Sequence, residues 1–326
     1  MFDLSVISPV LLWTAIAIYA ASFVAYAFDL ARRSQATADA QTVRERELVG
    51  AGARSGSGAV TPTGAPVDPA PQRFVMARIG TSLMVLAWVF HLAAVVTRSI
   101  AAGRVPWANL YEFAMIGTLL IVLVYLIVLT RIDLRYLGTF ITGLVVILLG
   151  LAATNFYVAV TPLMDPLKSI WLIIHVFVAS LGTAFFAMAF ALSALQLMQS
   201  RRERLVREGA AKTGPGFLRT LPLSDRLESL AYRFSIIGFI LWTFTLIAGA
   251  IWAQDAWGRY WGFDVKETWT FVIWVIYAGY IHARATRGWR GNPSAWLSIV
   301  GFAAVMFNFT IVNVFFKGLH AYSGLS

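Results

Sequence analysis

The stretch FAMIGTLLIVLVYLIVLT, residues 113–130, contains no charged side chain. A helix needs about 20 apolar residues to cross the roughly 30 Å hydrocarbon layer of a bilayer, so this stretch predicts a transmembrane helix. Such a helix satisfies its own backbone hydrogen bonds, which lipid cannot do. Comparable apolar stretches lie at about 8–28, 77–97, 137–158, 170–198, 233–252, 268–284 and 295–316. We therefore predict an all-α fold, a polytopic transmembrane helical bundle of about eight spans.

The composition supports a membrane protein. Of the 326 residues, 59% are hydrophobic and 13% are charged, whereas soluble domains have about 25% charged residues. The chain has no cysteine, which excludes disulfides, thiolate metal sites and thiol redox chemistry by this chain. A net charge of +10 would suggest nucleic acid in a soluble protein. Here we attribute it to basic cytoplasmic loops, and we expect a lipid bilayer and no nucleic acid as partner.

Basic residues are distributed unevenly between alternate loops. If the N-terminus is outside, twenty of the 26 Lys and Arg residues fall in cytoplasmic loops and six fall outside. The positive-inside rule favours this orientation. We expect a multi-pass protein of the cell (plasma) membrane, with N- and C-termini outside and with the loop 252–267 on the outer side.

The chain divides into three predicted parts. Residues 1–33 form a first transmembrane span. Residues 34–72, rich in Gly, Ala, Ser, Thr and Pro, predict a disordered cytoplasmic linker. Residues 73–326 form the main transmembrane domain, in which the basic stretch 199–229 predicts a cytoplasmic loop with some helix.

Residues 251–269, IWAQDAWGRYWGFDVKETW, place aromatic rings beside charges between two apolar stretches. Trp and Tyr are generally enriched at membrane interfaces, which accounts for isolated tryptophans elsewhere in the chain. It accounts poorly for a cluster with interleaved glycines. The cluster comprises Trp252, Trp257, Tyr260, Trp261, Phe263 and Trp269.

The small and acidic residues of this stretch have ordinary structural interpretations as well. Gly258 and Gly262 either let the backbone lie against a flat ligand or simply permit turns. The spacing of Asp264 and Glu267 is typical of a capping box at a helix start, and we favour that role over acid–base catalysis.

The chain has four histidines. His175 lies near the outer end of its span and His320 follows the last span, so both share the compartment of the aromatic loop. His91 and His282 lie at membrane depth. A hydrogen bond to a neighbouring helix explains one such histidine, but ionisable residues inside a bilayer are costly and often functional.

Two outer histidines beside indoles favour haem over zinc. Zinc takes three or four ligands, and no cysteine or carboxylate cluster accompanies these histidines. Haem iron takes two axial imidazoles, and the apolar porphyrin face stacks on indoles. A cation is expected to pair with the haem propionates. The sequence leaves open which one, and the candidates are Arg259, Lys168, Lys266 and Lys317.

The segment WGRYWGFDVKETW resembles the tryptophan-rich WWD signature of haem-handling proteins, approximately W-G-x-x-W-x-W-D-x-K-E. Phe263 stands where a third Trp is usual. Further matches are SIWLIIHV around His175, PWANLYE at 106–112 and NVFFKGLHAYS around His320. Together they resemble the CcsA/ResC family of cytochrome c biogenesis, called CcsB in some bacteria, over about residues 75–326.

This resemblance implies two histidine pairs. His175 and His320 would ligate the iron of haem b at the outer face. His91 and His282 would receive haem on its way across, although His91 is expected to lie farther out than His282. The predicted haem-binding residues beside the outer pair are Trp252, Trp257, Trp261, Phe263, Asp264 and Trp269.

The resemblance also implies a haem lyase function. The chain would act as part of a synthase that joins haem to the Cys-x-x-Cys-His segment of apocytochrome c, with a CcsB/ResB-type membrane partner and a thiol-reducing protein in the pathway. A haem transporter or chaperone without ligation activity would use the same binding residues. A secondary transporter of another solute is disfavoured, because inverted repeats and broken helices are not evident.

Overall fold

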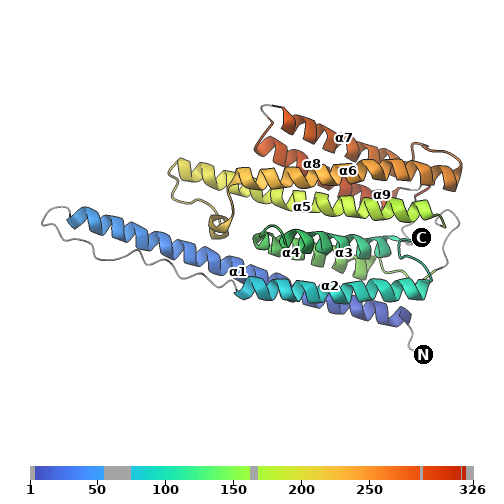
Figure 1. Cartoon of the computed structure of the whole chain (residues 1–326), viewed down its shortest axis with the longest axis horizontal. Helices are drawn as coiled ribbons and strands as arrows, with labels where there is room; N and C mark the ends of the chain where they lie inside the picture. The colour runs from blue at the N-terminus through green and yellow to red at the C-terminus, as the bar shows by residue number, and fades with distance from the viewer. Residues whose placement is uncertain (1–3, 55–74, 162–167, 287–288, 317, 321–326) are drawn as a thin grey trace.

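The computed structural model describes residues 4–54, 75–161, 168–286, 289–316 and 318–320. Across these residues the chain forms helices and no strands. The long helices lie side by side as one bundle (Figure 1). The elements are α1 (Leu4–Arg54), α2 (Val75–Ala102), α3 (Leu110–Leu129), η1 (Arg135–Leu137), α4 (Gly138–Asn155), α5 (Ile170–Arg207), η3 (Gly216–Thr220), α6 (Ser224–Trp257), α7 (Val265–Ala285), α8 (Asn292–Phe309) and α9 (Ile311–Phe315).

The predicted polytopic membrane bundle is confirmed. Seven helical segments in the described part of the chain are long and apolar enough to cross a membrane, and they correspond to α1 to α6 and to α8 with α9. The eighth predicted span is α7, which has spanning length. Its many Trp, Tyr and Thr residues make it less apolar than the other seven.

The aromatic loop and the basic loop lie at opposite ends of the bundle (Figure 1). The connection from α2 to α3, the loop between α6 and α7, and α9 share one end. The connections from α3 to α4 and from α5 to α6 share the other. This arrangement agrees with the alternation of basic loops in the sequence, and the outward orientation of the aromatic end remains a prediction.

The predicted linker differs from the structure in its first part. Helix α1 continues to Arg54, whereas disorder was expected from residue 34. Residues 34–54 are rich in Ala, Gln, Glu and Arg, which favour helix, and the Pro-containing stretch begins later. The rest of the predicted linker, 55–72, lies outside the described residues.

Helices α5 and α6 form a closely packed pair. A Cβ added to Gly182 would lie 3.4 Å from the backbone oxygen of Gly238, and one added to Gly238 would lie 2.7 Å from Cδ1 of Phe186. Small residues allow two membrane helices to approach in this way. The same face of α6 continues at helical spacing to Gly249 and Trp252, which carry the pairing to the aromatic end of the bundle.

Candidate functional site

His175 is held in one orientation by α6. Its Nδ1 lies 2.9 Å from the backbone oxygen of Thr245. A carbonyl only accepts hydrogen bonds, so Nδ1 carries the proton and the lone pair is on Nε2. The ring stacks on Trp252 at a centroid distance of 5.8 Å. Gly249 makes room for it, because a Cβ there would lie 2.7 Å from Cε1 of the imidazole.

His320 is held by Asp264, at the start of α7. Its Nδ1 lies 2.8 Å from Oδ2 of Asp264, and the Leu319 backbone N–H donates to Oδ1 at 3.1 Å. The approach is so close that a Cβ on Gly318 would lie 2.1 Å from Oδ1. Two donors on one carboxylate therefore fix this turn and leave Nε2 of His320 available to a metal.

Asp264 also caps α7, as the sequence predicted. Its side chain accepts from the Lys266 backbone N–H at 3.3 Å, and Glu267 accepts from the Asp264 backbone N–H at 3.1 Å, which completes the capping box. The link to His320 was not predicted. It joins residues 56 positions apart, and only the return of the chain after α9 brings them together.

The electrostatics of Asp264 and His320 favour the neutral form of the His320 imidazole. The hydrogen bond from His320 holds the pKa of Asp264 below its usual value. Burial lowers the pKa of His320 below its usual value, although the Asp264 hydrogen bond opposes this. At neutral pH the carboxylate is therefore ionised and the imidazole is neutral, which is the form that ligates metals.

One cavity brings the predicted outer pair together. His175 and His320 both line it, and its other walls are mainly apolar side chains of α3, α4, α5 and α8. The buried Trp252 contacts both imidazoles, with its ring centroid 5.4 Å from that of His320. Trp257 packs against both His320 and Trp252, with ring centroid distances of 4.8 Å and 4.9 Å. Four of the predicted haem-binding residues thus form one constellation.

The ring contacts of the remaining predicted aromatics, Trp261, Phe263 and Trp269, are with residues other than the two imidazoles. Trp261 lines a small adjoining pocket that both histidines also reach. Trp269 packs against Phe307 of α8 at 4.4 Å. Phe263 is 81% exposed and has a φ of +57°, so it does not form a wall of the cavity.

The two glycines of the aromatic loop serve the loop itself. Gly258 ends α6 with a φ of +71°, a left-handed cap that glycine adopts without strain. Gly262 leaves space for a neighbouring side chain, because a Cβ there would overlap the guanidinium of Arg259. The turn interpretation of these glycines is therefore the one that the structure supports.

The second predicted pair is not brought together. His91 is fully buried in α2, with Nδ1 3.5 Å from the Tyr19 hydroxyl. Its Nε2 has no hydrogen-bond partner among the described residues, although the Met115 backbone lies beside the ring. His282 is exposed in the last turn of α7. Helices α2 and α7 lie on opposite sides of the bundle (Figure 1).

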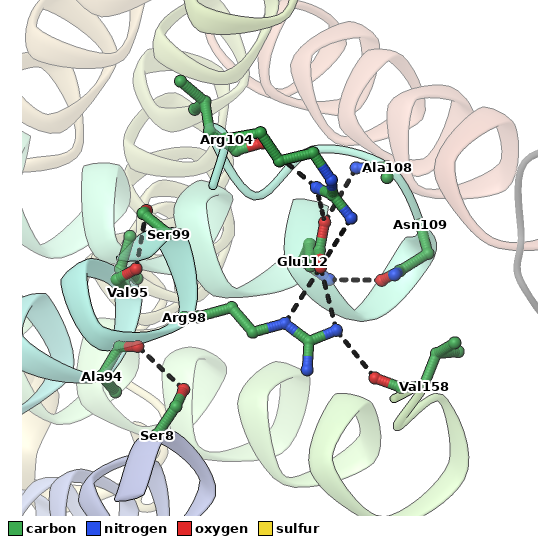
Figure 2. Close-up of polar contacts among 11 residues, drawn as sticks. Ser8, Ala94, Val95, Arg98, Ser99, Arg104, Ala108, Asn109, Glu112 and Val158 are labelled. Atoms are coloured by element: carbon green, nitrogen blue, oxygen red, sulfur yellow. Dashed lines mark hydrogen bonds and ion pairs between the residues drawn. The ribbon is translucent and has the colours of Figure 1, made fainter. Parts of the chain in front are cut away.

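A buried ion-pair network beside the cavity was not predicted as part of the site. Figure 2 shows the Glu112 carboxylate between two guanidiniums. Arg98 Nε lies 2.9 Å from Oε1, and Arg104 Nη1 lies 2.7 Å from Oε2. The Ala108 backbone N–H also donates to Oε2 at 2.9 Å. The side chains of Arg98 and Glu112 are 1% and 0% exposed.

This network fixes two connections at the aromatic end. Arg98 Nη2 donates to the Val158 backbone oxygen at 2.7 Å, which ties down the segment after α4 (Figure 2). The turn between α2 and α3, held in this way, packs Trp107 against the buried cluster of Leu172, Val176 and Trp252, and Trp107 also lines the cavity. The segment PWANLYE was the available signal, but it gave no role to Glu112.

Comparisons with known proteins agree with this architecture. The family model described as "Cytochrome C assembly protein" matches residues 107–320. "Cytochrome c biogenesis protein CcsA" of Prochlorococcus marinus is 34% identical over 250 residues, which cover 70% of this chain and 78% of that protein. The protein of the same name from Guillardia theta is 33% identical over 264 residues, covering 76% and 86%.

A solved structure shares the fold. "Cytochrome c Heme Lyase CcmF" aligns with a TM-score of 0.62 and 16% identity over 95% of this chain and 47% of its own. The chain thus spans about half the length of that protein. At this identity the likeness concerns the fold alone.

Proposed function

The chain belongs to the CcsA family of cytochrome c assembly proteins, and from this premise we propose that it is the membrane component of a cytochrome c synthase. It holds haem b between His175 and His320. It presents the haem at the outer face of the plasma membrane for covalent thioether attachment to apocytochrome c.

One observation carries this proposal. Two imidazoles line a common, mainly apolar cavity, and each has its Nδ1 on an oxygen acceptor, the Thr245 carbonyl or the Asp264 carboxylate. Histidines that ligate metals typically donate their second nitrogen to such an oxygen, which sets the tautomer and the ring direction. Both Nε2 atoms are then ready for axial coordination of a haem iron.

The chain contributes binding and orientation rather than a nucleophile. The reduced thiols of a Cys-x-x-Cys-His segment add across the haem vinyl groups, so that the S–H bond of each thiol and the π bond of one vinyl group are replaced by a C–S and a C–H bond. The histidine of that segment displaces one protein ligand. The chain has no cysteine of its own, so no thiol of this protein competes for the vinyl groups.

Three partners follow from this chemistry. Apocytochrome c supplies the Cys-x-x-Cys-His segment, and a thiol-reducing protein keeps its cysteines reduced. A CcsB/ResB-type membrane protein completes the synthase.

The haem site is tested by absorption spectroscopy of the purified protein with its membrane partner. We expect a six-coordinate low-spin haem spectrum that weakens in His175→Ala and in His320→Ala and returns when imidazole is added. The added imidazole controls for misfolding, because it restores only a site that is otherwise intact. Unchanged spectra in both single variants contradict the site.

Attachment is tested separately from binding. We expect covalent haem on an apocytochrome co-expressed with this chain and its partner, and its loss in the same two variants. A protein that binds haem with the expected spectrum but yields no covalent product is a haem transporter or chaperone instead.

A further inference from the structure

Lys266 lies in the first turn of α7, close to both histidines. It lines the large cavity and the small adjoining pocket together with His175 and His320. Its ammonium donates to Oδ1 of Asn313 in α9. That amide is held in turn, because its Nδ2 donates to the Phe309 backbone oxygen at 2.7 Å. The fold therefore holds the lysine at the part of the cavity that both imidazoles also line.

In the described part of the chain no ion pair within 4.0 Å involves Lys266, and the Asp264 carboxylate acts on its ammonium only from beyond that distance. The two nearest acidic residues along the helix are engaged elsewhere. Asp264 accepts from His320 and Leu319, and Glu267 accepts from the backbone N–H groups of Gly262 and Asp264. A partly buried cation with a neutral amide as its partner is poorly compensated, and an anion that enters the cavity would gain from it.

We propose that Lys266 pairs with a propionate carboxylate of haem and so fixes the rotation of the porphyrin about the axis between the two imidazoles. The inference rests on the proposed haem site. Two axial ligands define the position and the plane of a porphyrin, but they leave it free to turn about the line through the iron. A single cation away from that line, paired with a carboxylate on the porphyrin edge, removes this freedom.

The other cations of the aromatic end are placed less well for this role. The guanidinium of Arg259 folds over Gly262. Neither Arg259 nor Lys168 lines the cavity that holds the two histidines. Of the four cations that the sequence left open, Lys317 lies outside the described residues. The geometry thus favours Lys266, and Arg259, in the loop just before α7, serves as a control.

The test compares two iron porphyrins that differ only in their carboxylates. Iron protoporphyrin IX carries two propionates, and its dimethyl ester carries none that can ionise. Both are titrated into the purified complex, and the low-spin absorption band gives the affinity. Because a hydrogen bond to a charged group contributes about 1.5–3 kcal/mol, the wild-type protein should prefer the free acid by about 10- to 150-fold.

Three variants test whether the preference for the free acid over the ester depends on Lys266. Lys266→Met, which keeps the length and the apolar stem of the side chain, should lose the preference by binding the free acid more weakly and the ester as before. Lys266→Arg should keep much of it, and Arg259→Met should keep all of it. A Lys266→Met protein that retains the wild-type preference, or that loses affinity equally for both porphyrins, overturns the inference.

Failure of the proposed function looks different. If the wild-type complex binds neither porphyrin with a low-spin spectrum, the haem site itself is wrong and the role of Lys266 is overturned with it. If the wild-type and Lys266→Met complexes give the same low-spin spectrum and the same ratio of affinities, the haem site stands and only the lysine contact is refuted.

Discussion

The substitution Asp264→Asn separates the two roles of this residue. Asn is as good a helix N-cap as Asp, so α7 should still begin where it does. The contact with His320 changes, because an amide offers one oxygen where the carboxylate offers two. His320 and Leu319 donate to different oxygens of Asp264, so one of these donors must face the amide NH₂.

The expected loss follows from the hydrogen bond to His320, which is 2.8 Å long and charge-assisted. Such bonds contribute about 1.5–3 kcal/mol, and a loss of about 2 kcal/mol corresponds to roughly a 30-fold weaker haem affinity. Two physical effects produce it. The hydrogen bond to the imidazole loses its charge assistance, and wherever the amide NH₂ faces Nδ1 the tautomer with the proton on Nε2 gains population, which removes the Nε2 lone pair from the iron.

The assay is a haem titration of the purified complex, followed by the low-spin absorption band, with thermal unfolding of the haem-free protein measured alongside. We expect weaker haem binding with little change in stability, and recovery of the low-spin band with added imidazole. Glu267→Gln is the control, because Glu267 belongs to the same capping box and makes no hydrogen bond to His320. Wild-type haem affinity and spectrum in Asp264→Asn would refute the reasoning.

Three further substitutions test the surroundings of the site. Gly249→Ala should displace the imidazole of His175, whose Cε1 would lie 2.7 Å from the new Cβ, and so weaken haem binding in a titration. Gly279→Ala is the control, because a Cβ there meets no atom within 4 Å, and it should leave the haem affinity unchanged. Glu112→Gln should lower the free energy of unfolding by about 3–5 kcal/mol in chemical denaturation, because it leaves buried guanidiniums without a charge partner; Asp133→Asn, whose side chain is 64% exposed, should change it by less than about 1 kcal/mol. Phe263→Asn should raise the unfolding free energy by about 0.5–1 kcal/mol, because Asn tolerates the positive φ better, and an altered low-spin spectrum in that variant would contradict the exposed position of this ring.

The spans were predictable because lipid solvation is a local property of the sequence. An uncharged run such as 113–130 has few alternatives to a membrane helix, and it forms most of α3. The ends of helices were less predictable, since α1 continues through polar residues that favour helix. Hydropathy detects burial in lipid and is insensitive to a helix that continues into water.

The site was predictable only in part, because its contacts are distant in sequence. Resemblance and topology singled out His175 and His320, and the structure places both on one cavity. The resemblance placed Asp264 among the predicted haem-binding residues, but the local sequence gives no sign of its hydrogen bond to His320, which is 56 positions away. Likewise Arg98 and Arg104 look like ordinary cations at a helix end until the turn folds them onto Glu112.

The two remaining histidines show how helix arrangement limits inference from sequence order. A shared iron needs both imidazoles at one height and within reach of one another. His282 lies about 25 Å along α7 from Val265, given a rise of 1.5 Å per residue, so it is near the end of the bundle opposite the aromatic loop. His91 lies nearer the aromatic end of α2, against Tyr19 of α1. Helix α2 packs on α1 and α3, whereas α7 packs on α6 and α8. His91 and His282 therefore differ in height along the bundle and also lie on different sides of it. Within the described residues, the outer pair is the one that lines a common cavity, with its rings oriented by a backbone carbonyl and a carboxylate, and this is why the proposed bis-imidazole site is placed there.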